Sequence, residues 1–193
     1  MSAAGLAAEA ERQVGATRWS REDHVDLDTF RSVMGSLATG VSVVTSLGEG
    51  AAPRGLTCSA VCSVSASPPL LLACVKLGSA TLDAIHDSEA FAVNILASGT
   101  DQLARTFASP VPERFDGVRW TGAPRTGAPL LTDHSTAWAE CAVVDSRQVG
   151  DHQLVVGRIL SGGTSPAKDP LAFWRTRFTP LARPDAVPDA ATG

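Results

Sequence analysis

Three short segments of this 193-residue chain carry residue types that can bind a ligand. The first runs from Gly55 to Ser67 and is strand-like, but small polar residues stand where core strands usually have Val or Ile. Small side chains let a flat ligand approach the backbone, whose N–H and C=O groups can then recognise its polar edge. A plain edge strand followed by a serine-rich loop is an equally good interpretation of this composition.

The second segment, Lys76 to Thr81, lies at a predicted junction between a strand and a helix. The first N–H groups of a helix have no partner within it and form a positive dipole end, and nearby hydroxyl groups add donors. Ser79 and Thr81 therefore make this junction a candidate site for a phosphate or another anion. The simpler interpretation is an ordinary serine N-cap.

The third segment is Gly150-Asp151-His152, in the predicted turn between two long strands. A histidine at a strand edge can hydrogen-bond to a ligand or stack on it. The alternative is a solvated turn without a ligand. Taken alone, none of the three segments identifies a reaction.

Other catalytic and metal-binding patterns are weak or missing. The sequence has no G-x-G-x-x-G or G-x-x-x-x-G-K-[ST] nucleotide motif and no G-x-S-x-G nucleophile motif. Four cysteines lack the paired spacing of a zinc site, and we interpret them as small buried hydrophobic residues: Cys58, Cys62, Cys74 and Cys141. We therefore expect no metal site. The chain has no tyrosine and only two lysines, which limits acid–base and Schiff-base chemistry.

Length and composition indicate one globular domain. A chain with 44% hydrophobic and 19% charged residues can bury a substantial core. Its net charge of −4 argues against a nucleic-acid partner. The longest apolar run, Leu70 to Val75, is far shorter than the roughly 20 residues of a membrane-spanning helix. Because no secretory signal pattern is present and the cysteines read as thiols, we expect a cytoplasmic protein without a membrane partner.

The sequence pattern predicts more strands than helices. Residues 1–25 and 183–193 are expected to be flexible tails around one domain, 26–182. Asp26 is expected to cap a helix that ends by Gly40, and further helices are expected at 80–86, from about Thr100 and after Pro170. The expected strands are 41–45, 55–65, 70–75, 91–96, 118–121, 136–149 and 152–161. This pattern favours a mainly β fold, a small β-barrel with short peripheral helices.

From about Phe30 to Leu181, the chain resembles the flavin reductase components of two-component flavin-dependent monooxygenases. The resemblance rests on motifs in the family's order: Thr39–Thr45 (T-G-V-S-V-V-T), Gly55–Ala60 (G-L-T-C-S-A) with Ser63, Ser65 and Pro68-Pro69, Ser88–Leu96 (S-E-A-F-A-V-N-I-L), Phe107 with Arg114–Val118 (R-F-D-G-V), and Gly150-Asp151-His152 with Gly157. The chain departs from the family pattern at Ala60, where Ser is frequent, at Lys76-Leu77, where Asn-Arg is frequent, and at Phe178, where Tyr is frequent.

This resemblance implies a split β-barrel that binds FMN or FAD, usually as a homodimer with sites near the subunit interface. NADH or NADPH would deliver a hydride to the flavin, and the reduced flavin would diffuse to a separate monooxygenase. The residues expected around the flavin are Thr57, Cys58, Ser59, Ala60 and Ser63 along its ring and ribityl chain, and Ser79 and Thr81 at its phosphate, with Lys76 beside them. His152, next to Asp151, would contact the nicotinamide and is the one residue expected to take part in catalysis. Because the cofactors carry the redox chemistry, the protein needs no acid–base pair.

Two other functions fit the same barrel. One is a flavin-binding or sensor module without reductase turnover. The other is a flavoenzyme that retains its flavin and acts on an organic substrate, in a pocket shaped by the loop 108–130. The sequence does not distinguish FMN from FAD or NADH from NADPH.

Overall fold

The computed structural model describes residues 23–181. Contacts within the chain divide it into two units, with the boundary after Leu37. The first unit contains helix α2 (Leu27–Gly35). Asp26 caps this helix as predicted, because its carboxylate accepts a hydrogen bond of 2.7 Å from the Thr29 N–H. The helix stops short of the predicted end at Gly40. None of its residues is buried, and Phe30 and Val33 are 53% and 64% exposed. Most of the predicted tails, 1–22 and 183–193, lies outside the described residues.

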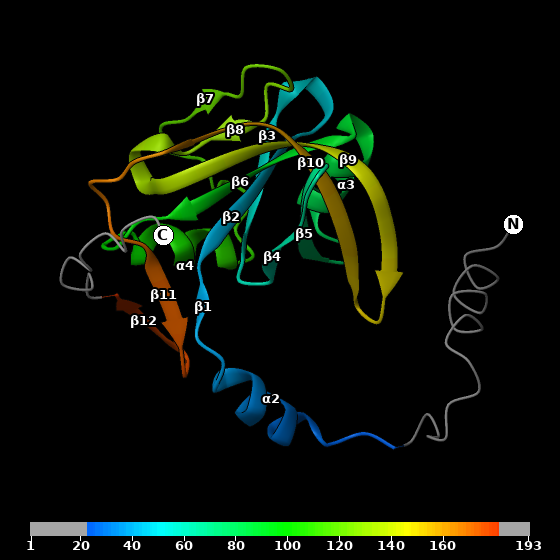
Figure 1. Cartoon of the computed structure of the whole chain (residues 1–193), viewed down its shortest axis with the longest axis vertical. Helices are drawn as coiled ribbons and strands as arrows, with labels where there is room; N and C mark the ends of the chain where they lie inside the picture. Colours follow the sequence, from blue (N-terminus) through cyan, green and yellow to red (C-terminus); the bar gives the residue numbers. More distant parts are fainter. Residues whose placement is uncertain (1–22, 182–193) are drawn as a thin grey trace, which may run out of the picture. The chain divides into compact units, whose positions relative to one another are not determined.

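The second unit is a β-barrel with two short α-helices (Figure 1). Its strands are β1 (Thr39–Gly40), β2 (Ser42–Leu47), β3 (Pro53–Cys58), β4 (Val61–Ala66), β5 (Pro69–Lys76), β6 (Ala90–Leu96), β7 (Thr121–Gly122), β8 (Pro129–Leu130), β9 (Ser135–Val149), β10 (His152–Thr164), β11 (Leu171–Trp174) and β12 (Arg177–Pro180). The helices are α3 (Ala80–Ser88) and α4 (Asp101–Ala108), and short 3₁₀ turns cover Glu49–Ala51 and Thr132–His134. No helix among the described residues is long and apolar enough to cross a membrane.

Strand order explains why the main sheet curls. Its seven strands lie in the order β3-β2-β6-β9-β10-β5-β4, so β3 and β4 are the two edges. Only Ser59 and Ala60 separate these edge strands in the chain. A two-residue connection cannot span a flat seven-stranded sheet, because neighbouring strands lie about 4.8 Å apart. The sheet therefore curls until its edges approach each other, which gives the split β-barrel expected from the sequence.

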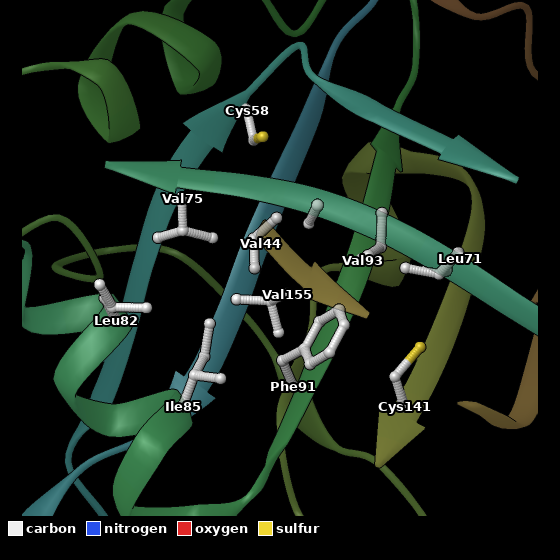
Figure 2. Packing of buried hydrophobic residues seen from close by; sticks show 11 residues of the cluster. Val44, Cys58, Leu71, Val75, Leu82, Ile85, Phe91, Val93, Cys141 and Val155 are labelled. Atoms are coloured by element: carbon white, nitrogen blue, oxygen red, sulfur yellow. The ribbon is translucent and has the colours of Figure 1, made fainter. Parts of the chain in front are cut away.

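Alternation along each strand fills the barrel. On β5, Leu71, Ala73 and Val75 are buried, whereas the residues between them point to the opposite face. The main core cluster joins these side chains to others from β2, β6, β9, β10 and α3. Figure 2 shows Phe91 beside Val155, and both are completely buried. A second cluster lies between α4 and β11, around Phe107 and Leu171.

Three local predictions differ from the structure. The predicted strand 118–121 is displaced, because the strand in this loop, β7, covers only Thr121–Gly122. The predicted helix after Pro170 is wrong, because the chain forms the hairpin β11–β12 there, and β11 pairs with β1. Phe173 and Phe178 of this hairpin pack against the second core cluster, and this long-range burial outweighs the local helix signal. The predicted strand 55–65 is divided at Ser59 and Ala60, where the chain passes from one edge of the sheet to the other.

Candidate functional site

The three candidate segments meet at one end of the barrel. Lys76, the last residue of β5, lies directly opposite His152, the first residue of β10. The Ala60 carbonyl accepts a hydrogen bond of 2.9 Å from the Cys74 N–H, so the corner between β3 and β4 lies beside the same end of β5. Segments separated by up to about 90 residues in sequence therefore form one surface, which the sequence alone does not show.

The corner between β3 and β4 provides the flat, small-residue surface that the sequence predicts. Ser59 and Ala60 are both exposed and lie outside the strands. Ser63 is exposed too, but it lies farther along β4, opposite Leu71. Because the side chains of Ser59 and Ala60 are small, they leave space for a planar ligand at this corner.

Thr57 and Cys58 offer a ligand less than their side chains suggest. The Thr57 hydroxyl donates a hydrogen bond of 2.7 Å to the Ala104 carbonyl of α4. Cys58 is 5% exposed and belongs to the main core cluster. Its Sγ lies 3.3 Å from the carbonyl oxygen of Cys74. Both side chains hold β3 in place: the Cys58 side chain is buried, and the Thr57 hydroxyl, with its donor used, can only accept a hydrogen bond from a ligand.

The start of α3 combines a helix cap with a cation. The Ser79 Oγ accepts a hydrogen bond of 3.2 Å from the Leu82 N–H and donates one of 2.9 Å to the Lys76 carbonyl. The N-cap interpretation of Ser79 is therefore confirmed. The Lys76 side chain is exposed next to the first turn, where helix N–H groups favour an anion. Thr81 is only 1% exposed, so its hydroxyl is poorly placed for the predicted phosphate contact.

The turn between β9 and β10 holds His152 in one orientation. Its Nδ1 lies 2.9 Å from the Asp151 Oδ1, and the Asp151 carbonyl accepts a hydrogen bond from the Leu77 N–H. The hydrogen bond from His152 lowers the pKa of Asp151 below its usual value, and the nearby Lys76 charge adds to this effect. Asp151 is therefore ionised at neutral pH and orients the ring, which leaves Nε2 available to a ligand.

Arg114 positions the strand that leads to the site, a role that residue-by-residue reasoning missed. Its guanidinium donates to the Gly55 carbonyl at 2.7 Å and to the Ser109 carbonyl at 2.9 Å. Gly55 in turn lies against Phe107, because a Cβ there would approach the ring to 2.8 Å. The loop after α4 thus fixes the start of the β3 segment. The R-F-D-G-V motif was the only sequence signal for this role.

Three of the four cysteines are wholly or partly buried and are poor nucleophiles, whereas Cys62 is exposed, so the prediction that all four are buried is wrong for Cys62. Burial raises the pKa of Cys58 to about 11 and that of Cys141 to about 12, and it also raises the pKa of Cys74. Since the thiolate is the reactive form, these thiols are inert at neutral pH. Among residues 23–181, no group of three or more His, Cys, Asp or Glu side chains is arranged to hold a metal ion.

Comparison with known proteins assigns this barrel to a family. The family model for the flavin reductase like domain matches residues 34–182. A flavin reductase (NADH) from Kitasatospora aureofaciens is 46% identical over 155 residues, which cover 80% of this chain and 81% of that protein. The reductase subunit of a flavin-dependent monooxygenase from Rhodococcus jostii is 34% identical, with 85% of this chain and 83% of that protein covered.

A solved structure agrees with these sequence matches. The NADH:FAD oxidoreductase from Streptomyces globisporus, solved in complex with NAD and FAD fragments, superposes with a TM-score of 0.76. The two chains are 35% identical, and the match covers 87% of this chain and 99% of that one. The agreement therefore extends over the whole barrel.

Proposed function

This chain belongs to the flavin reductase-like family, and we propose where its flavin binds. It is an NAD(P)H-dependent flavin reductase, the reductase subunit of a flavin-dependent monooxygenase. The site is the barrel end formed by the β3–β4 corner, Lys76, the start of α3 and the turn at His152. The observation that carries this proposal is the pairing of Lys76 with His152 beside the exposed corner at Ala60.

The residues present fit a flavin nucleotide. The exposed Ser59 and Ala60 leave room for a planar ring, and the backbone of the corner is close enough to recognise its polar edge. Lys76 and the N-terminus of α3 supply positive charge for a phosphate. When bound, the flavin accepts the hydride that the nicotinamide coenzyme supplies. The chain's own residues bind and orient the two molecules.

Steady-state turnover tests this function. The purified protein is mixed with NADH or NADPH and with FMN or FAD, and nicotinamide oxidation is followed by absorbance. We expect flavin-dependent oxidation with at least one pair and free exchange of the flavin between turnovers. Flavin that stays bound through gel filtration without any turnover would instead indicate a sensor module. Turnover without flavin exchange would indicate a flavoenzyme that acts on an organic substrate.

His152→Ala is expected to raise the KM for NAD(P)H more than it weakens flavin binding. Loss of one hydrogen bond or ring contact, about 1 kcal/mol, corresponds to roughly a fivefold change. Steady-state kinetics and a flavin titration measure the two effects separately. Asp151→Asn, which keeps the turn but removes the orienting charge, is expected to show a smaller rise in the same KM. A larger effect on flavin binding than on the KM would place His152 at the flavin instead.

The proposal includes a homodimer, and two apolar surfaces support it. The outer face of β5 and β10 carries apolar side chains that are only half-buried: Leu70, Leu72, Cys74, Leu154 and Val156. This face continues into Lys76 and His152, which point to the same side of the sheet. The exposed apolar side chains of α2, such as Phe30 and Val33, are a second surface that a partner subunit can bury.

Light scattering tests the dimer. We expect a mass of twice the 20.0 kDa of one chain for the wild-type protein. Leu154→Glu puts a charge on the outer face of β5 and β10 and is expected to give a monomer with an unchanged far-UV CD spectrum. Val111→Glu, at an exposed apolar residue in the loop after α4, serves as the matched control and is expected to remain dimeric. A wild-type monomer would contradict the proposal.

The partner and the location complete the proposed function. The reduced flavin is released and reaches a separate monooxygenase, so no stable complex between the two proteins is required. We place the protein in the cytoplasm, since all four cysteines are free thiols.

A further inference from the structure

The hairpin β11–β12 forms an open groove that the proposed flavin site does not use. The groove has a volume of about 490 Å³ and is lined by Trp174, Arg175, Arg177, Phe178 and Thr179. This volume is within the range of small-molecule sites. Its walls combine aromatic faces with guanidinium groups, which is the chemistry that recognises a planar base attached to phosphate.

Positive charge is concentrated around this groove although the chain as a whole carries a net charge of −4. The Arg175 guanidinium lies 4.8 Å from the centre of the Trp174 ring, and the Arg105 guanidinium lies 4.9 Å from that of Phe178. None of the ion pairs within residues 23–181 neutralises Arg175 or Arg177. These two guanidinium groups can therefore pair with an anionic ligand.

The turn of the hairpin holds Arg175 over Trp174 in an unusual conformation. Arg175 and Thr176 have φ angles of 46° and 63°, in the left-handed region that two-residue hairpin turns require. Glycine or asparagine is the usual choice there, and a β-branched residue is rare. The chain thus keeps a large cationic residue at a position where backbone geometry alone favours a small one.

The groove is connected to the proposed flavin site through α4. Thr57, in the β3 segment, donates its hydrogen bond to the carbonyl of Ala104. The next residue, Arg105, stacks on Phe178 of the groove. Helix α4 therefore contacts both the strand that leads to the proposed flavin site and the hairpin that forms the groove.

We propose that this groove binds the ADP moiety that FAD and NAD(P)H share. The adenine stacks on the Trp174 and Arg175 planes, and the phosphates pair with Arg175 and Arg177. The inference rests on the proposed flavin reductase function, because that function supplies the two ADP-containing substrates. FMN and reduced nicotinamide mononucleotide lack this moiety, and they provide the test.

The experiment compares Trp174→Leu and the double variant Arg175→Gln/Arg177→Gln with wild type, each under four substrate pairs. The pair FMN with reduced nicotinamide mononucleotide contains no ADP and reports on folding and hydride transfer alone. FAD with the mononucleotide tests the flavin as the source of ADP, and FMN with NADH tests the coenzyme. Arg31→Gln/Arg54→Gln removes the same charge elsewhere and is the matched control. Inhibition by free ADP gives a direct binding constant.

We expect the variants to raise the KM for at least one ADP-containing substrate and the inhibition constant of ADP at least fivefold. Turnover of the pair without ADP should stay within twofold of wild type, and the control variant should match wild type throughout. The dinucleotide whose KM rises is the one that uses the groove. Unchanged values for FAD, NADH and ADP would overturn the inference, even if FMN turnover is normal. If wild type fails to turn over any pair, the proposed function fails, and ADP binding by calorimetry still tests the groove.

Discussion

Gly157→Val is expected to lower the free energy of unfolding by about 3 kcal/mol, a large share of the stability of a typical domain. A Cβ at Gly157 would lie 2.5 Å from the Phe91 Cζ and 2.8 Å from the Cys141 Cβ. Both neighbours are completely buried in the main core cluster, so neither can move into open space. The added side chain must therefore push β10 away from β6 and β9.

Chemical denaturation measures this effect, with the midpoint and the slope both recorded. Gly40→Val is the matched control, because a Cβ at Gly40 meets no atom within 4 Å. The control is expected to unfold close to the wild-type midpoint. If Gly157→Val and Gly40→Val were equally stable, the close packing of Phe91 on β10 would not be a feature of the protein in solution.

Glu140→Gln is expected to destabilise the fold by about 2–3 kcal/mol at neutral pH. Glu140 is completely buried on β9, where its carboxylate accepts hydrogen bonds from the backbone N–H groups of Arg125 and Thr126 and from the Ser161 hydroxyl. With its oxygen toward the two backbone N–H groups, Gln points its NH₂ group at the Ser161 Oγ, which must then accept instead of donate, and all three hydrogen bonds lose the negative charge that strengthens them. Thermal unfolding at neutral pH measures the loss, and Glu113→Gln, at an exposed loop residue, is the control.

The same variant should change how stability depends on pH. Burial alone would raise the pKa of Glu140, but the hydrogen bonds from Ser161, Thr126 and Arg125 outweigh it and lower the pKa. Because the pKa of Glu140 is lower in the folded state, the ionised carboxylate stabilises the fold at pH values above its unfolded-state pKa of about 4.3. This stabilisation is lost as the pH falls through the folded-state pKa. Wild type is expected to lose more stability than Glu140→Gln between about pH 6 and pH 3. Parallel pH profiles for the two proteins would contradict this role.

Local signals in the sequence predicted the framework of the site. Asp26 and Ser79 are N-caps as expected, and the apolar run from Leu70 to Val75 forms a strand as expected, although only alternate residues of it are buried. The resemblance gave the order of the motifs. These features depend on neighbouring residues or on strand period, so they are readable without a structure.

Features that depend on long-range contacts could not be predicted from the sequence. Glu140 stands in a strand where a surface position is the default for a carboxylate, and only the loop around Thr126 explains its burial. The residues after Pro170 form a strand because β1 lies beside them. The aromatic and cationic side chains of the β11–β12 groove are ordinary surface residues until the hairpin brings Trp174 and Phe178 to one side.

The strand order also has a consequence for how the protein is made. Strand β5 is complete at Lys76, but one of its two neighbours, β10, begins only at His152. During synthesis, roughly 75 more residues must therefore be added after β5 before β10 can pair with its free edge. An apolar strand with an open edge is prone to pair with other chains. The nascent chain is thus most vulnerable to aggregation in this interval, and any truncation before β10 leaves the barrel permanently open.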